Sequence, residues 1–206
     1  MQNQLDLFAP VIKASKPNIT RFEAINGLTL IENFITKEEE KSLMSAIDNG
    51  LWLNDLRRRV QHYGYKYDYR ARRIDLSMKI GNLPEWAAEI ATRLYEDRYF
   101  NNTPDQLIVN EYEVGQGITP HIDCEPCFED TIVSISLNST ATMNFNHSVT
   151  NEKIPVFLPR RSAVILKEES RYAWKHSIPA RKSDKYENQV YPRKRRVSLT
   201  FRTVIL

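Results

Sequence analysis

Thr119-Pro120-His121-Ile122-Asp123 is the stretch on which the interpretation of this chain depends, because it places an imidazole and a carboxylate two residues apart. In a β-strand, side chains at positions i and i+2 leave the same face, so His121 and Asp123 can point toward one metal ion. His176 lies further along, in another strand-like run, and supplies a third ligand. Two histidines and one carboxylate on one face of a metal are typical of non-haem Fe(II) oxygenases. A lone His-x-Asp also occurs as a hydrogen-bonded surface pair, so a second signal is needed.

The last strand-like run, Arg196-Val197-Ser198-Leu199-Thr200-Phe201-Arg202, supplies that signal. Alternation places its polar side chains on one face and its apolar side chains on the other. Two guanidiniums on one face, from Arg196 and Arg202, match carboxylates with paired hydrogen bonds and suit a dicarboxylate. An Fe(II) site beside a strand that binds a dicarboxylate indicates 2-oxoglutarate as a cofactor.

Two helical patterns precede a long series of strand-like runs. Thr36 and Glu39 form a capping box that predicts a helix over about 37–49, and Pro84 begins a second helical pattern near 84–98. The segment 179–193 is a long loop that would serve as a lid. Strand-like runs cover 28–34, 106–113, 131–138, 140–146, 154–158, 162–167, 171–176 and 195–206.

This order of elements predicts an α+β fold, a double-stranded β-helix (jelly roll) with its N-terminal helices packed on one sheet. The chain has 206 residues, which fits one such domain, and its 41% hydrophobic content is enough for a core. We expect this domain to cover 21–206 and a flexible tail to cover 1–20. We also expect a monomer.

Composition and charge bound the setting of the protein. No apolar run approaches the ~20 residues of a membrane span, and Met1 to Pro10 lacks the features of a signal peptide. We therefore expect a cytoplasmic protein without membrane contact. The net charge is only +3, but the sequence pI is 8.8 and basic residues are clustered. Such clusters suit either a polyanion or a solvated surface; they are Arg57-Arg58-Arg59, Arg70-Ala71-Arg72-Arg73 and Arg193-Lys194-Arg195-Arg196.

Cys124 and Cys127 are the two cysteines of the sequence, in the spacing Cys-x-x-Cys. A structural zinc site needs four ligands, and there is no second cysteine pair to complete one. Zinc deaminases differ as well, since their His-x-Glu precedes a distant Pro-Cys-x-x-Cys. We expect two free thiols in a reducing compartment.

Over about residues 27–206 the sequence resembles the AlkB family of Fe(II)/2-oxoglutarate dioxygenases. The motifs that carry the resemblance are Asn110-Glu111-Tyr112, His121-x-Asp123, Glu169-Ser170-Arg171, His176 and Arg196-x-Ser198-x-x-x-Arg202. The resemblance implies Fe(II), 2-oxoglutarate and O2 as cofactors, with the iron bound by His121, Asp123 and His176. It implies that 2-oxoglutarate is held by Asn110, Tyr112, Arg196, Ser198 and Arg202.

Two positions depart from the family pattern. Ser198 stands where many repair members have asparagine, and Glu168 replaces a common glycine before Glu-Ser-Arg. Neither position is an implied metal ligand. Within the implied site, we expect Arg196 to hold the distal carboxylate of 2-oxoglutarate and Arg202 to lie nearer its iron-chelating end.

The residues around these motifs suggest how a substrate is held. Tyrosines alternate from Tyr63 to Tyr69 and would share one face of a strand, either as core or as a base-stacking platform. A flipped base would stack on Tyr67 or Tyr69 beside the metal. Glu125 resembles the acid with which repair demethylases read the exocyclic amino group of adenine or cytosine. Arg171 is also expected to bind the substrate.

Three functions remain open. The first is oxidative demethylation of alkylated nucleobases, N1-methyladenine and N3-methylcytosine, in DNA or RNA, as alkylation damage repair. The second is hydroxylation of a tRNA wobble uridine, because Arg58-Arg59-Val60 and Leu158-Pro159-Arg160-Arg161-Ser162 resemble the tRNA-modifying AlkB homologue. That homologue also carries an RNA-recognition motif and a methyltransferase domain, which we do not find in this sequence. A non-catalytic jelly-roll binding module is disfavoured by the intact triad and both arginines.

The first residues point to a partner. Gln4-Leu5-Asp6-Leu7-Phe8 resembles the short motif by which bacterial DNA-maintenance enzymes dock on the sliding clamp. In such docking, Leu7 and Phe8 would fill an apolar pocket while Gln4 makes polar contacts. The alternatives are an unstructured tail and an N-terminal arm packed on the jelly roll. The clamp-like motif favours DNA repair.

Overall fold

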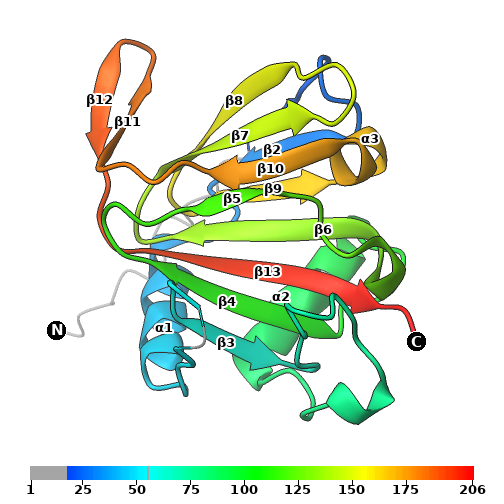
Figure 1. Cartoon of the computed structure of the whole chain (residues 1–206). Coiled ribbons are helices and arrows are strands. Elements are labelled where there is room, and N and C mark those ends of the chain that lie inside the picture. Colours follow the sequence, from blue (N-terminus) through cyan, green and yellow to red (C-terminus); the bar gives the residue numbers. More distant parts are fainter. Residues whose placement is uncertain (1–17, 55) are drawn as a thin grey trace, which may run out of the picture.

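Two antiparallel β-sheets face each other in this protein, whose computed structural model describes residues 18–54 and 56–206 (Figure 1). The strands of the larger sheet are, in spatial order, β1 (Asn18–Arg21), β2 (Leu28–Glu32), β9 (Ala163–Leu166), β6 (Phe128–Leu137), β13 (Arg196–Val204), β4 (Gln106–Tyr112) and β3 (Val60–Tyr63). Those of the smaller sheet are β5 (Ile118–His121), β10 (Trp174–Ile178), β7 (Ala141–His147) and β8 (Lys153–Leu158). This arrangement confirms the predicted double-stranded β-helix.

The alternation predicted for the last strand is present in β13, which pairs with β6 on one side and β4 on the other. Val197, Leu199 and Phe201 belong to the core beneath the helices. Arg196 and Arg202 leave the opposite face and line a cavity between the two sheets. One strand therefore contributes apolar side chains to the core beneath the helices and two cationic side chains to the cavity.

The helix α1 (Lys37–Asp48) begins at the predicted capping box. The backbone N–H of Glu39 donates to the Thr36 hydroxyl at 3.1 Å, and the Glu39 carboxylate accepts from the Thr36 backbone N–H at 2.7 Å. Both bonds satisfy N–H groups that a helix start would leave unpaired.

The helices α1 and α2 (Glu85–Glu96) cover one face of the larger sheet (Figure 1). Their apolar faces share a core with the strands beneath them, which confirms the predicted packing. None of the described helices is long and apolar enough to cross a membrane. The helical members of this core are Leu43, Ile47, Ala87, Ile90, Ala91 and Leu94.

Two late segments differ from the predictions. The strand predicted over 171–176 is instead the short helix α3 (Glu168–Tyr172) followed by β10. The Ser170 backbone N–H donates to the Asn26 carbonyl at 2.9 Å, a long-range bond that local patterns do not reveal. The predicted loop 179–193 contains a hairpin of β11 (Ser183–Tyr186) and β12 (Gln189–Pro192). Its two turn residues have left-handed backbones, which only Asn188 would have suggested.

The row of alternating tyrosines does not share one strand face. β3 ends at Tyr63, and the chain bends at Gly64, whose φ is +77°. Tyr63 packs edge-on against Trp86 of α2, with ring centres 5.6 Å apart, whereas Tyr67 and Tyr69 line the cavity between the sheets. The prediction is wrong because the bend at Gly64 ends the alternation.

The start of the chain also differs from its predicted boundary. Asn18 pairs with Glu32 across β1 and β2, so residues 18–20, expected in the flexible tail, belong to the larger sheet. The rest of the predicted tail, including Gln4 to Phe8, lies outside the described residues.

We expect Gly64→Ala to lower the free energy of unfolding by roughly 2–4 kcal/mol. A Cβ at this position would lie 1.8 Å from the Asp105 carbonyl oxygen, in addition to the strain of a positive φ. Gly115→Ala is the matched control, because Gly115 has a φ of +89° and no atom within 4 Å of the added Cβ. Its cost should be about 1 kcal/mol by urea denaturation. Equal costs at the two positions would contradict the close approach at Gly64.

Candidate active site

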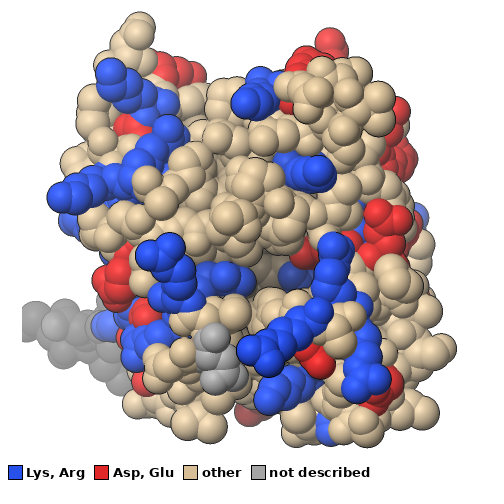
Figure 2. All heavy atoms as spheres, in the orientation of Figure 1, with Lys and Arg blue, Asp and Glu red and all other residues tan. Residues whose placement is uncertain are grey.

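A cavity of about 350 Å³ opens between the two sheets at the His-x-Asp stretch. Figure 2 shows a hollow in the middle of this face, with Lys and Arg side chains around it. Most of the predicted site residues lie in its wall, although they come from segments far apart in the sequence. Those that line it are Tyr67, Tyr69, Asn110, Tyr112, His121, Asp123, His176, Arg196, Ser198 and Arg202.

The three predicted metal ligands come together at one side of this cavity. His121 ends β5 and lies directly opposite His176 of β10 in the smaller sheet. Asp123 follows two residues after the end of β5, with its Oδ1 3.7 Å from the His121 Nε2. One ligand atom from each side chain lies within 4.8 Å of the others. The spacing of the atoms therefore fits a single metal ion.

Hydrogen bonding and burial set the protonation of these side chains. The His121 Nδ1 lies 2.8 Å from the Thr119 carbonyl, which only accepts, so Nδ1 is the donor and Nε2 is the nitrogen that can bind a metal. Burial lowers the pKa of His176 to about 3, so its imidazole is neutral. Burial alone would raise the pKa of Asp123, but the Arg202 charge and the imidazoles outweigh it and hold that pKa below its usual range. The His176 imidazole and the Asp123 carboxylate are thus unprotonated, and the His121 Nε2 lies beside them, which fits Fe(II).

Arg202 orients the Asp123 carboxylate. Its Nε donates to Asp123 Oδ2 at 3.0 Å and its Nη1 donates to Gln106 Oε1 at 3.1 Å. The guanidinium carbon also lies 4.8 Å from the centre of the Phe128 ring. Because Oδ2 is taken by the arginine, Oδ1 is the oxygen that faces His121.

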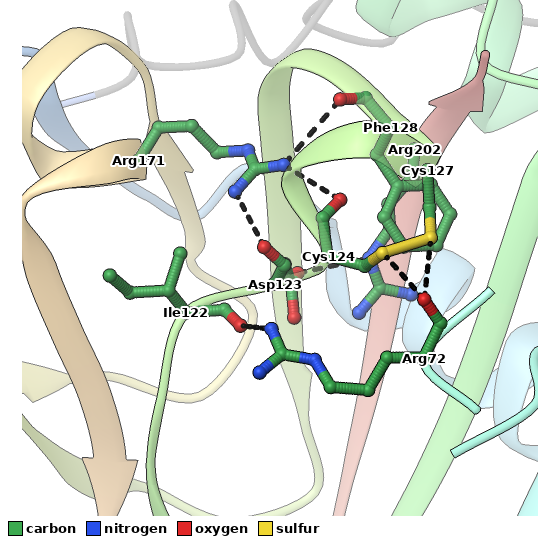
Figure 3. Close-up of a disulfide and its surroundings, with 8 residues drawn as sticks. All are labelled: Arg72, Ile122, Asp123, Cys124, Cys127, Phe128, Arg171 and Arg202. Atoms are coloured by element: carbon green, nitrogen blue, oxygen red, sulfur yellow. Dashed lines mark hydrogen bonds and ion pairs between the residues drawn. A yellow bond between two sulfur atoms is a disulfide. The ribbon is translucent and has the colours of Figure 1, made fainter. Parts of the chain in front are cut away.

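Arg171 lies behind the site and does not line the cavity, which corrects the expectation that it binds substrate. Only 2% of this residue is exposed, and it donates to three backbone carbonyls (Figure 3). Nη1 donates to Asp123 at 3.0 Å, and Nη2 donates to Cys124 at 3.2 Å and to Phe128 at 3.5 Å. Its guanidinium therefore fixes the loop that carries Asp123.

The burial and the hydrogen bonds of Arg196 indicate whether the cavity fits a dicarboxylate. It is 3% exposed, and its Nη2 donates to the Ser136 hydroxyl at 2.7 Å. Its Nε and Nη1 have no hydrogen-bond partner among the described residues. Burial lowers the pKa of Arg196 to about 10, so the group stays charged near neutral pH. A buried cation with two unpaired donor nitrogens in a cavity wall fits the distal carboxylate of 2-oxoglutarate.

Asn110 and Tyr112 of β4 face the same space because the register pairs them with Ser198 and Arg196 of β13. Arg58 completes this wall, although the sequence placed it only in a basic cluster and in a stretch similar to the tRNA-modifying homologue. Its Nε donates to Asn110 Oδ1 at 2.8 Å, and its guanidinium carbon lies 6.0 Å from the centre of the Tyr112 ring. Arg58 belongs to a basic cluster that resembled a surface patch, and its inward direction depends on contacts with β4 that local patterns do not show.

An aromatic wall stands beside the predicted metal ligands. The Tyr67 and Tyr69 rings meet edge-on with centres 5.0 Å apart, and Tyr67 lies 5.8 Å from Phe128. Arg72 is exposed and reaches the same cavity, although the sequence placed it only in a basic cluster. Glu125 is exposed at the start of the short helix η2 (Glu125–Cys127), and its role as a base reader stays a prediction.

The basic cluster at 193–196 is not the surface patch that its sequence suggested. Arg193 is 8% exposed and its Nε lies 2.6 Å from the Asp184 carboxylate. Arg195 pairs with Glu111, also at 2.6 Å. These two side chains therefore form ion pairs within the protein, so fewer cations of the cluster are available to bind a polyanion than predicted.

The two cysteines are joined in a disulfide, which corrects the expectation of free thiols. Cys124 directly precedes η2 and Cys127 is its last residue, and in a 3₁₀ turn the side chains at i and i+3 project from the same side. The Cα atoms of Cys124 and Cys127 are 5.3 Å apart, within reach of a disulfide. Counting zinc ligands could not reveal this pairing, because it depends on the conformation of the turn.

Comparisons with known proteins agree with this geometry. A family model described as the 2OG-Fe(II) oxygenase superfamily matches residues 27–202. The Arabidopsis thaliana alkylated DNA repair protein ALKBH8 homolog is 40% identical over 203 residues, covering 87% of this chain and 59% of that protein. The mouse tRNA (carboxymethyluridine(34)-5-O)-methyltransferase ALKBH8 is 39% identical over 169 residues, covering 77% of this chain.

The chain spans only a quarter of that mouse protein, 25% of its length. Among solved structures, that of OsALKBH1 superposes with a TM-score of 0.66 over 90% of this chain and 100% of the other. The sequence identity is 18%, so this likeness supports the fold alone.

We expect Asp123→Ala to abolish metal binding and also to lower the free energy of unfolding by about 3 kcal/mol, because Arg202 would lose its buried carboxylate. The double variant Asp123→Ala/Arg202→Met removes the stranded charge, so it should regain most of the stability while still failing to bind metal. Calorimetric titration with Fe(II) under anaerobic conditions and urea denaturation measure the two effects separately. Metal binding by either variant at the level of the unmodified protein would contradict the assignment of Asp123.

Proposed function

Because the chain belongs to the 2OG-Fe(II) oxygenase superfamily, as an AlkB-like dioxygenase with Fe(II), 2-oxoglutarate and O2 as cofactors, we propose that it oxidatively demethylates nucleobases in nucleic acid. N1-methyladenine and N3-methylcytosine are the proposed lesions, in DNA or RNA, and the proposed role is alkylation repair. When bound, iron and 2-oxoglutarate supply the O2-dependent oxidation of a substrate C–H bond. The chain's own residues position the reactants.

The observation that carries this proposal is a tyrosine wall next to the candidate metal ligands. Tyr67 and Tyr69 line the same cavity as His121 and His176. A base inside a duplex is out of reach of such a cavity, so it must leave its stack, and tyrosine rings offer a stacking surface in return. Glu125 is proposed to accept a hydrogen bond from the exocyclic amino group of adenine or cytosine.

Exposed arginines near the cavity would hold the phosphates on either side of a flipped base. Arg57 precedes Arg58, and both Arg70 and Arg73 flank Arg72, which itself reaches the cavity. All but Arg58 are exposed. Cations arranged this way favour a polyanionic substrate and would make binding fall with rising salt.

Hydroxylation of a tRNA wobble uridine is the second candidate, favoured by the 39% identity to the mouse tRNA-modifying relative. Because this chain covers a quarter of that protein, its activity does not transfer without a test. The exposed acid at Glu125 favours demethylation, since uracil has no exocyclic amino group to donate to it.

The two functions predict different products by mass spectrometry. Incubation with Fe(II) and 2-oxoglutarate should remove one methyl group, with release of formaldehyde, from oligonucleotides carrying N1-methyladenine or N3-methylcytosine. Addition of one oxygen to a carboxymethyluridine RNA without formaldehyde would favour the second candidate instead. Arg196→Met should need about 30-fold or more 2-oxoglutarate for half-maximal turnover. Turnover of neither substrate would contradict both assignments.

The motif Gln4 to Phe8 lies outside the described residues, and we propose that it docks on a sliding clamp. A short apolar peptide of this kind binds with micromolar affinity, on the order of −8 kcal/mol. Leu7→Ala with Phe8→Ala should abolish co-elution with a bacterial clamp and leave turnover of free oligonucleotides unchanged. If the segment packs on the jelly roll instead, the same double substitution will lower the melting temperature and the activity together.

A further inference from the structure

The disulfide lies at the junction between the candidate metal ligands and the tyrosine wall. Cys124 directly follows Asp123, and the bridge to Cys127 closes the turn η2. Both sulfurs lie beside the carbonyl of Arg72 in the segment 65–75, here called the flap, which also carries Tyr67 and Tyr69. The disulfide therefore lies between Asp123, a candidate metal ligand, and the tyrosine wall of the cavity.

Arg72 makes polar contacts between the flap and residues 122–128, which carry Asp123 and are here called the metal-ligand loop (Figure 3). Its Nη2 donates to the Ile122 carbonyl at 3.2 Å. Its own carbonyl oxygen lies 3.1 Å from the Cys124 sulfur and 3.5 Å from the Cys127 sulfur. The Tyr67 ring adds an aromatic contact with Phe128 at 5.8 Å, so Arg72 supplies the hydrogen bond that joins the flap to the metal-ligand loop, beside that ring contact.

Those two sulfur–oxygen distances suit hydrogen bonds that a disulfide cannot make. A disulfide sulfur carries no proton, so the Arg72 carbonyl faces two groups that only accept. A thiol is a weak donor, and once the S–S bond breaks the two sulfurs move apart to van der Waals distance, from which each thiol can direct a proton at that oxygen. The oxidised form thus leaves the flap without bonds that the reduced form can supply.

We propose that Cys124 and Cys127 form a redox site that exchanges with dithiols, and that its reduced form latches the flap over the cavity. In the exchange, the S–S bond breaks and accepts two electrons and two protons from a dithiol, which itself becomes a disulfide. The oxidised form releases the Arg72 carbonyl and the flap opens more often.

The metal-ligand loop should keep its place in both redox states. Arg171 holds the carbonyls of Asp123, Cys124 and Phe128 without using either sulfur. The redox state therefore changes the position of the flap and of the tyrosines that it carries, independently of which base the cavity accepts. It goes beyond the proposed function and can be tested without a substrate.

Burial of the sulfurs couples the exchange to the flap itself. Cys124 is 3% exposed and Cys127 is 4% exposed, so a dithiol reaches them only when the flap moves away. Any ligand that closes the flap should accordingly slow the reduction, since coupling between two equilibria is reciprocal.

Limited trypsin digestion tests the proposal on the full-length protein, because the flap contains the exposed Arg70, Arg72 and Arg73. The protein is reduced with dithiothreitol, desalted under nitrogen and compared with the oxidised protein, and alkylation with mass spectrometry counts the free thiols in each. Cleavage in the flap should be about fivefold slower in the reduced protein. Cleavage after the exposed Lys185 in the β11–β12 hairpin should be equal in both and serves as the internal control. Fe(II) affinity should change less than about twofold, because Arg171 holds the loop in either state.

Paired variants separate the hydrogen-bond donors from the covalent bridge. Cys124→Ser/Cys127→Ser keeps two donors and should resemble the reduced protein with or without dithiothreitol. Cys124→Ala/Cys127→Ala has neither donors nor bridge and should be cleaved at least as fast as the oxidised protein. The proposal is overturned if reduction leaves flap cleavage unchanged or accelerates it, if no thiols appear after treatment, or if the two folded double variants are cleaved at the same rate.

Discussion

Two arginines on β13 carry positive charge into the space between the sheets, and the site is arranged around the balance of that charge. Arg202 is balanced within the chain by the Asp123 carboxylate. Arg196 leaves the same face and has a serine hydroxyl but no carboxylate partner among the described residues. An uncompensated charge inside a protein costs several kcal/mol, and a carboxylate of 2-oxoglutarate would compensate that of Arg196. The proposed role of Arg196 in binding a dicarboxylate thus follows from the burial of β13.

The same strand explains why the metal and cofactor residues are held more firmly than the substrate residues. β13 is hydrogen-bonded on both sides and packs its opposite face under two helices. Tyr67 and Tyr69 instead stand on the flap, a segment outside the sheets that Arg72 ties to the metal-ligand loop. Rigid strands suit chemistry that needs fixed distances, and a loop suits a substrate that must enter and leave.

Most predictions that succeeded rest on patterns along the chain, and His176, which is distant from Asp123 in the sequence, was predicted through the resemblance to a family. The capping box at Thr36, the alternation of β13 and the overall jelly roll could all be predicted because each leaves a local pattern. The features that were missed depend on contacts between distant segments or on one unusual backbone angle. The helix α3 is fixed by a hydrogen bond from Ser170 to the distant Asn26. The tyrosine row bends because Gly64 has a positive φ. Arg171 points inward because it donates to carbonyls of another loop. The disulfide needs the 3₁₀ turn between its cysteines.

The unpaired N–H groups of Arg196 also bear on how long the polypeptide survives. A ligand that binds only the folded state adds RT ln(1 + [L]/Kd) to its stability, about 2.7 kcal/mol when the ligand is at 100 times its Kd. When the dicarboxylate is scarce, a larger fraction of molecules is unfolded at any moment and open to proteolysis. Through one buried guanidinium, the supply of a central metabolite would therefore govern the abundance of this enzyme as well as its rate.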